Sequence, residues 1–72
     1  MGKTIHNHIR RLRFERHEMT QQDLADRIGV TRQTVNAIEL GKYSPSLDVA
    51  FRIAEVFAVP LDRVFEYGAK RG

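Results

Sequence analysis

The stretch from Gln21 to Leu40 constrains the fold of this 72-residue chain more than any other feature. Its apolar residues have the three-to-four spacing of two successive helical faces and are Leu24, Ala25, Ile28, Val35 and Ile38. Gly29 stands just past the first of these faces, where glycine adopts a left-handed backbone at no steric cost and so ends a helix. Ala25 is small enough for a second helix to cross closely over the first. The stretch therefore predicts two short helices joined by a tight turn.

The outward side of the second helix carries long or hydrogen-bonding side chains, namely Arg32, Gln33, Thr34 and Asn36. Such groups match the donors and acceptors that base-pair edges present in the major groove of DNA. An ordinary solvated helix face is the alternative explanation. The two-helix pattern around these residues favours base contact, because together the helices form a helix-turn-helix.

Composition sets outer limits on the class of protein. The chain carries nine arginines and three lysines, a net charge of +3 and no cysteine, and it is long enough for one domain, 1–72. Arginine matches phosphates and guanine edges well, although charge alone does not establish nucleic-acid binding. The absence of cysteine fits a reducing compartment, and no apolar run suits a membrane span or a signal peptide. We expect a cytoplasmic protein with no membrane partner.

The whole chain predicts an all-α domain of five helices, with no stretch of period-two alternation that would favour a strand. The expected helices cover about Ile5–Arg16, Gln21–Ile28, Arg32–Leu40, Leu47–Ala58 and Leu61–Phe65. Thr20, Thr31 and Ser46 are the expected N-caps. The core should span about residues 5–65, with a loose start at 1–4 and a frayed end at 66–72.

Several motifs, in this order and spacing, resemble the Cro/repressor-type (XRE-like) helix-turn-helix transcriptional regulators, and in particular their compact stand-alone members. The motifs are Met-Thr-Gln-Gln-Asp-Leu-Ala at 19–25, Ile-Gly-Val-Thr-Arg-Gln-Thr-Val at 28–35, Ile-Glu-Leu-Gly-Lys at 38–42, Pro-Ser-Leu at 45–47, Ile-Ala at 53–54 and Leu-Asp-Arg-Val-Phe at 61–65. The resemblance implies a five-helix, repressor-like fold. It also implies a sequence-specific regulator of transcription, a repressor, that binds double-stranded DNA as a homodimer through its third helix.

The resemblance also implies roles for individual residues. The implied base-reading residues are Arg32, Gln33, Thr34 and Asn36, and the implied phosphate-binding residues are Gln21, Thr31, Lys42 and Tyr43. Gln21 has a separate physical warrant, because free amides at a helix N-terminus attract an anion. An arginine of the first helix is implied to pair with a glutamate late in the third, which points to Arg13 and Glu39.

The chain departs from the family pattern at two turns. His17 and Glu18 stand where a glycine is frequent, in a turn that is one residue longer than the commonest form. This departure affects the expected tilt of the first helix. Leu40 stands where asparagine is usual before the glycine, which affects how the third helix is capped.

Catalytic and metal-binding functions find little support in the sequence. No nucleophile–base arrangement or paired-carboxylate motif is present, and no glycine-rich phosphate loop, so we do not expect an enzyme. His6, His8 and His17 are irregularly spaced and lack nearby acidic or cysteine partners, so no metal site is expected. We expect no cofactor, and no small-molecule effector site is evident.

Apolar residues beyond the needs of one small core indicate an interface. They lie in the fourth predicted helix and in the ending Val-Phe-Glu-Tyr, and the candidate dimer contacts are Val56, Val59, Phe65 and Tyr67. A homodimer is the simplest explanation, because operators read by this motif are commonly two-fold symmetric. The alternative is an antitoxin or anti-repressor module that acts chiefly by binding a partner protein.

Overall fold

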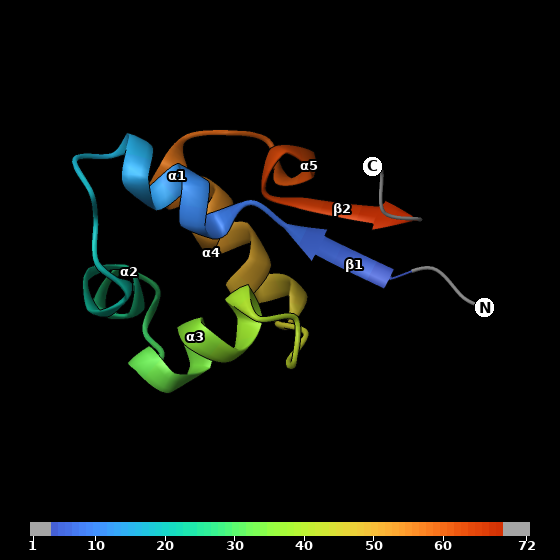
Figure 1. The fold of residues 1–72 in the computed structure, drawn as a ribbon, viewed down its shortest axis with the longest axis horizontal. Coiled ribbons are helices and arrows are strands. Elements are labelled where there is room, and N and C mark those ends of the chain that lie inside the picture. Colours follow the sequence, from blue (N-terminus) through green and yellow to red (C-terminus); the bar gives the residue numbers. More distant parts are fainter. Residues whose placement is uncertain (1–3, 69–72) are drawn as a thin grey trace.

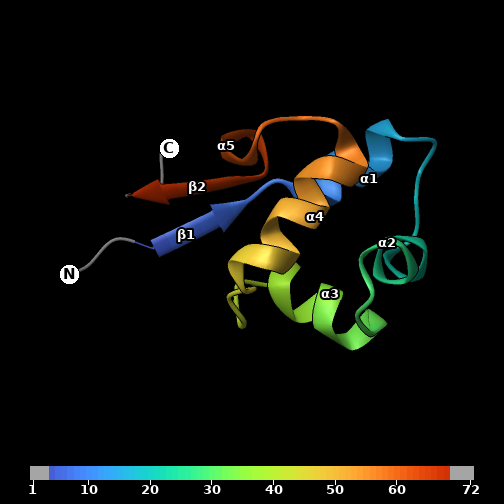
Figure 2. The ribbon, with the colours of Figure 1, turned by 180° about the vertical axis from the view of Figure 1, so that it is seen from behind.

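The structure, a computed structural model, describes residues 4–68 of the chain. Its elements in order are β1 (Thr4–Asn7), α1 (Ile9–Glu15), α2 (Gln21–Ile28), α3 (Arg32–Glu39), α4 (Leu47–Phe57), α5 (Leu61–Val64) and β2 (Phe65–Gly68) (Figure 1). The helices form a bundle, and the two strands lie side by side at one end of it. Seen from behind, α4 crosses the middle of the bundle between α1 and α3 (Figure 2). Five helices and a helix-turn-helix made by α2 and α3 are therefore confirmed.

Local signals in the sequence account for the ends of α2 and for the start of α3. The hydroxyl of Thr20 accepts from the backbone N–H of Asp23, and the Asp23 carboxylate faces the Thr20 N–H, which makes a capping box. Gly29 ends α2 in the left-handed region with φ of 79°. Thr31 then caps α3 by accepting from the N–H of Thr34 at 3.1 Å. The predicted bounds of α2 agree with the structure.

The core lies where the inner faces of all five helices meet. Its buried members are Ile9, Leu24, Ala25, Ile28, Val35, Ile38, Ile53, Ala54, Phe57 and Val64. Phe57 and Ile9 are fully buried, so α4 and α1 supply the largest side chains at the centre. This packing holds the two short helices of the motif, which would be marginal in isolation.

The prediction of an all-α domain without strands was wrong at the two ends of the chain. Thr4–Asn7 and Phe65–Gly68 pair as an antiparallel two-stranded sheet, with Ile5 opposite Tyr67. As a result α1 begins at Ile9 instead of Ile5, and α5 ends before Phe65. The four-residue strands are too short to show an alternation, while the spacing of Ile5 and Ile9 also fits a helix.

The expectation of loose ends needs the same correction. Thr4 and residues 66–68 belong to the sheet, so they are not a loose start or a frayed end. The remaining parts of that expectation, residues 1–3 and 69–72, lie outside the described residues.

The ends of α3 and α4 also differ by one residue from those predicted. α3 ends at Glu39, and Leu40 follows it as the C-cap, with Gly41 left-handed at φ of 76°. The N–H of Lys42 donates to the Ala37 carbonyl and that of Gly41 to the Ile38 carbonyl, which is a Schellman motif. The end of α3 is therefore capped by backbone N–H groups, and Leu40, which is 60% exposed, takes no part in capping through its side chain.

The turn between α1 and α2 contains two consecutive left-handed residues, His17 and Glu18, with φ of 59° and 56°. Their backbones take the conformation that glycine would adopt most readily. The carbonyl of Arg13 accepts from the N–H of Met19 at 2.9 Å, which closes the turn back onto α1. Within residues 4–68 no helix is long and apolar enough to cross a membrane.

Candidate nucleic-acid interface

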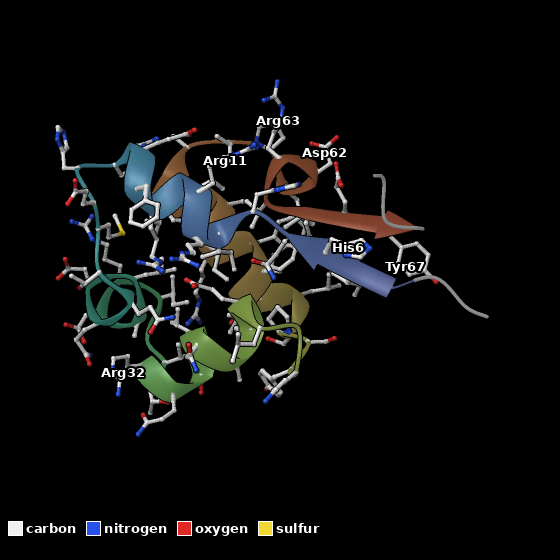
Figure 3. All side chains as sticks on the ribbon, viewed as in Figure 1. His6, Arg11, Arg32, Asp62, Arg63 and Tyr67 are labelled. Carbon is white, nitrogen blue, oxygen red and sulfur yellow. The ribbon has the colours of Figure 1, made fainter. Side chains whose placement is uncertain are left out.

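Helix α3 lies along one side of the bundle, and one face of it is open to solvent (Figure 3). Its inner face buries Val35 and Ile38, which are 1% and 2% exposed. Arg32, at the first turn, points away from the bundle. Gln33 beside it is exposed as well. The two foremost base-reading candidates are thus presented together at the N-terminal end of α3.

The other two base-reading candidates are engaged within the protein. The hydroxyls of Thr34 and Thr31 lie 3.0 Å apart, and Thr34 is half-buried. Asn36 is exposed, and its Oδ1 accepts from Nε2 of Gln21 at 3.1 Å. These contacts hold both side chains in defined orientations next to Arg32 and Gln33.

Gln21 bridges the two helices of the motif. As the first residue of α2, it donates from Nε2 to Asn36 and also to Oε1 of Glu39, at 3.2 Å. An amide nitrogen carries two N–H donors, so these two bonds use the donor capacity of the side chain. The structure therefore places Gln21 as a brace between α2 and α3.

Arg13 and Glu39 meet between α1 and α3. Nε of Arg13 donates to Oε2 of Glu39 at 2.7 Å and Nη2 donates to Oε1 at 3.0 Å, a bidentate pair. The side chains are 10% and 8% exposed, so the pair lies away from solvent. Nη1 of Arg13 also donates to the Met19 carbonyl at 2.8 Å. Glu39 is thereby fixed by two neighbouring helices, since Gln21 donates to it as well.

The loop after α3 carries the remaining phosphate candidates. Lys42 is exposed, and its backbone N–H is used in the Schellman motif. Tyr43 is 54% exposed and lines a pocket of about 340 Å³ that reaches the sheet residues Phe65 and Tyr67. Lys42 is close in sequence to the end of α3, whereas Tyr43 lies toward the sheet.

The dimer candidates occupy two different environments. Val56 and Val59 are half-buried and pack against the core. Tyr67 is 73% exposed, and with Phe65 it lines a groove of about 710 Å³. We call this the apolar groove, and its apolar lining consists of Ile5, Pro45, Leu47, Ala50, Pro60, Leu61, Phe65 and Tyr67.

Sequence reasoning named only Phe65 and Tyr67 among the apolar residues of the groove, and Ile5 and Leu47 are the large exposed side chains that it missed. Ile5 is 47% exposed and Leu47 is 71% exposed, although the sequence pattern put Ile5 on the core face of a helix. Ile5 reaches the groove because its strand pairs it with Tyr67. Only the pairing of two distant segments shows this, so no local signal could have found it.

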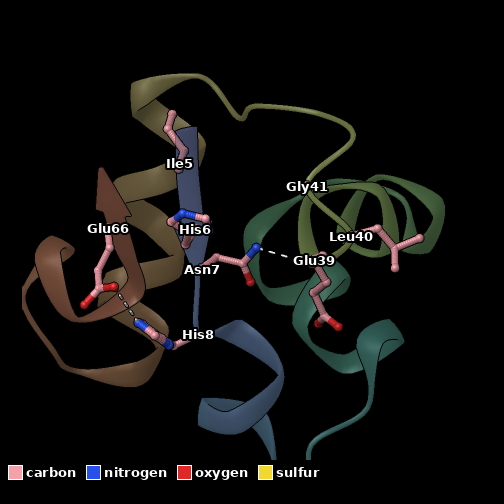
Figure 4. Close-up of a pocket in the computed structure, with 8 residues that line it drawn as sticks. All are labelled: Ile5, His6, Asn7, His8, Glu39, Leu40, Gly41 and Glu66. Atoms are coloured by element: carbon pink, nitrogen blue, oxygen red, sulfur yellow. Dashed lines mark hydrogen bonds and ion pairs between the residues drawn. The ribbon is translucent and has the colours of Figure 1, made fainter. Parts of the chain in front are cut away.

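Asn7 is a further residue that sequence reasoning missed. Its Nδ2 donates to the carbonyls of Ile38 and Glu39 at the end of α3, at 3.0 and 3.3 Å. Figure 4 shows the bond to Glu39. Its Oδ1 accepts from the N–H of Ile9 at 3.2 Å. A signal was present, because asparagine is favoured just before a helix and disfavoured inside one, where the predicted first helix had placed it.

Nε2 of His8 lies 3.7 Å from Oε1 of Glu66 across the sheet (Figure 4). In the part of the chain that the structure describes, no group of three histidine, cysteine or acidic side chains could hold a metal ion. Arg11 and Arg63 lie on the side of the bundle opposite Arg32 (Figure 3). Basic residues are thus spread over the surface, and charge alone does not single out the α3 face.

Comparison with known proteins places this geometry in a family. The helix-turn-helix family matches residues 9–64, which contain all five helices. An uncharacterised helix-turn-helix-type transcriptional regulator of Methanocaldococcus jannaschii is 55% identical over 51 residues, which cover 71% of this chain and 77% of that protein. The transcriptional repressor of the cryptic phage CTXphi of Vibrio cholerae is 40% identical over 53 residues, 74% of this chain and 47% of the repressor.

A solved structure agrees with these relatives. The crystal structure of a protein from Bacteroides fragilis, described as DNA-binding, has a TM-score of 0.77 and 25% sequence identity, and the match covers 88% of this chain and all of that one. Fold, motif and relatives agree, and the chain belongs to the helix-turn-helix family, among its Cro/repressor-type (XRE-like) transcriptional regulators.

Proposed function

We propose that this protein represses transcription by binding duplex DNA as a homodimer, with α3 of each copy in the major groove. The observation that carries the proposal is the exposed pair Arg32 and Gln33 at the N-terminal end of α3. In helix-turn-helix proteins, the N-terminal residues of the second helix contact base edges. Repression is supported by the relative from the CTXphi phage, which is a repressor.

Specific reading would come from side chains whose hydrogen-bonding groups fit particular bases. The guanidinium of Arg32 suits the two acceptors of guanine, and the amide of Gln33 suits the donor and acceptor of adenine. Asn36 and Thr34 would add contacts further along α3. Because Gln21 and Thr31 already hold these two side chains, their geometry is set before DNA arrives.

Phosphate contacts would hold α3 in register with the groove. Lys42 and Tyr43 would reach the backbone from the loop after α3, and Thr31 from its start. Since the side-chain amide of Gln21 is used within the protein, its phosphate contact would come from its backbone N–H in the first turn of α2. Such contacts position a protein on DNA without reading its sequence.

The proposed dimer joins two copies through the apolar groove and the strand ends beside it. One copy offers a single recognition helix, which gives few base contacts against a genome of competing sites. Tyr67 and Leu47 are large apolar side chains at least 71% exposed, so the groove leaves apolar surface that a second copy would cover. Val56 and Val59 would support the interface from the flank of the core.

Two substitutions separate the reading of bases from the holding of phosphates. We expect Arg32→Ala to relax preference at particular base pairs, at a cost of about 1–3 kcal/mol for a good bidentate contact. We expect Lys42→Ala to weaken binding to all sequences similarly and to lower the slope of log affinity against log salt by about one. Selection from a random duplex library, followed by fluorescence anisotropy at several salt concentrations, measures both effects.

Arg11→Ala is the matched control, because Arg11 lies on the opposite side of the bundle from Arg32. It removes the same charge and should leave both the preferred sequence and the salt slope nearly unchanged. An Arg32→Ala protein that keeps the preference of the wild type would show that α3 does not read the operator as proposed. Binding that is independent of salt would contradict duplex recognition through phosphates.

A further inference from the structure

Asn7 connects the recognition helix to the sheet. Its side-chain nitrogen donates to the backbone carbonyls of Ile38 and Glu39, at 3.0 and 3.3 Å, and Figure 4 shows the second of these bonds. Its side-chain oxygen accepts from the N–H of Ile9, at the start of α1. Its backbone lies in β1 directly opposite Phe65 of β2, a residue of the apolar groove. One side chain thus contacts the end of α3 while its own strand forms part of the groove.

The carbonyls that Asn7 contacts are among those that a helix cannot satisfy itself. The last four carbonyls of a helix lack partners within it. At α3 the backbone of Gly41 donates to the Ile38 carbonyl, and Asn7 adds a second donor there and one for Glu39. The amide of Asn7 therefore restrains the main chain of α3. Because both bonds are to backbone carbonyls, this restraint does not depend on the side chains of α3 that face DNA.

The other restraints on the C-terminal half of α3 come from elsewhere in the bundle. Arg13 of α1 and Gln21 of α2 both hold the carboxylate of Glu39. These two contacts fix α3 against the neighbouring helices. Asn7 is the member of this set that belongs to the sheet, and β1 lies beside the surface that we propose for the dimer.

We propose that Asn7 is a positioning residue, which sets the orientation of α3 relative to the dimer surface and so sets the spacing of half-sites that the dimer accepts. The inference rests on the proposed homodimer. Adding one base pair between two half-sites moves one of them by about 3.4 Å and rotates it by about 36°, since a turn of DNA takes about 10 base pairs in 34 Å. A dimer discriminates against this change only if each α3 is held firmly relative to the interface.

The test measures affinity for the selected palindrome and for versions with one base pair added or removed at the centre. Asn7→Ser keeps an oxygen that can accept from the N–H of Ile9, but the hydroxyl is too short to reach α3. Asn7→Asp keeps the size and the accepting oxygen and removes the donor. We expect the wild type to lose about tenfold or more per base pair of altered spacing and both variants to lose severalfold less. Affinity for a duplex with a single half-site should stay within about twofold of wild type, because the DNA-facing side chains are unchanged.

A stability control separates positioning from general weakening of the fold. Arg16→Met removes the bond from Arg16 to the carbonyl of Phe57, at the opposite end of α1 from Asn7, and should keep the spacing penalty of the wild type. Melting curves identify the temperature range in which each variant is folded, so that binding is measured within it. The test needs only one of the two Asn7 variants to be folded. Variants with the full wild-type spacing penalty would overturn the positioning role and leave the dimer standing. A wild-type protein indifferent to spacing would overturn the dimer proposal and this inference together.

Discussion

At the scale of single residues, Glu39 is the point where three segments hold the recognition helix. Its carboxylate accepts from Arg13 and from Gln21, and its carbonyl accepts from Asn7. A charge that is 8% exposed needs such partners, because burying an unpaired carboxylate is costly. Removing either partner of the Arg13–Glu39 pair should therefore destabilise the fold by more than the intact pair stabilises it.

Removing one member of the Arg13–Glu39 pair should destabilise the domain by about 3–5 kcal/mol, because the other charge stays buried without a partner. Such a loss is a large part of the stability of a small domain. Thermal and urea unfolding of Arg13→Met, Glu39→Gln and the double variant measure it. We expect the double variant to lose clearly less than the sum of the single losses.

The Asp48–Arg52 pair provides a control for this double-mutant cycle, in which the loss of the double variant is compared with the sum of the two single losses. These residues are one turn apart on α4, joined at 2.7 Å, with side chains 70% and 48% exposed. Exposed pairs of this kind contribute only about 0.3–0.5 kcal/mol, so their cycle should be nearly additive. An equally additive cycle for Arg13 and Glu39 would contradict a stabilising contact between α1 and α3.

At the scale of elements, α2, α3 and α4 each end at a left-handed residue, but the residue in that place differs. α2 and α3 use Gly29 and Gly41, with φ of 79° and 76°. α4 uses Ala58 at φ of 56°, and the N–H groups of Ala58 and Val59 donate to the Glu55 and Ala54 carbonyls. This is again a Schellman motif, now with a residue that pays a steric cost for its conformation.

Ala58→Gly should therefore stabilise the domain by about 0.5–1 kcal/mol. Glycine relieves the left-handed strain, but the greater conformational entropy of glycine in the unfolded chain offsets part of this stabilisation. Ala58 is exposed, so no packing is lost. Ala58→Val should do the reverse, since a β-branched residue is still less tolerant of positive φ. Melting temperatures that do not rank Gly above Ala above Val would contradict this account of the α4 terminus.

At the scale of the whole molecule, the sheet places both chain segments that flank the bundle at one end, beside the apolar groove (Figure 1). Ile5 and Tyr67 lie opposite each other on the two strands, and Leu47 at the start of α4 is a third large exposed apolar residue of the groove. A two-stranded sheet alone is only marginally stable, so covering one face with a second copy would strengthen it. The proposed interface and the sheet would then support each other.

Tyr67→Glu and Leu47→Glu should each yield monomers in sedimentation equilibrium and lower affinity for a palindromic operator by about a hundredfold or more, because the two half-sites are no longer held together. Both residues are largely exposed, so helical content should stay close to that of the wild type. Phe65→Glu is a poorer test, since Phe65 is half-buried against the core and its loss would also weaken packing.

Phe14→Glu is the control for these variants. Phe14 is 54% exposed on α1, has Arg10 above its ring at 5.6 Å, and does not line the groove. It should leave the oligomeric state unchanged. A wild-type protein that stays monomeric at high concentration, both free and on its selected operator, would show that the groove serves no self-association.

Most of the helical framework could be read from the sequence, because its determinants are local. The apolar spacing, the caps Thr20 and Thr31 and the glycine at 29 act within one or two turns of the chain, and α2 has the predicted bounds. The residues facing outward on α3 follow from the same period. Arg13 and Glu39 are 26 residues apart, so their pairing came from family resemblance and not from any local pattern.

Only the tertiary structure decided what the two ends of the chain become. Each strand has four residues and gains its hydrogen bonds from a segment about 60 residues away, so neither carries enough local signal to be recognised. The same pairing turns Ile5 toward the groove and brings Asn7 to the end of α3. Helix bonds form within the segment that encodes them, whereas a sheet depends on a partner that only the folded chain supplies.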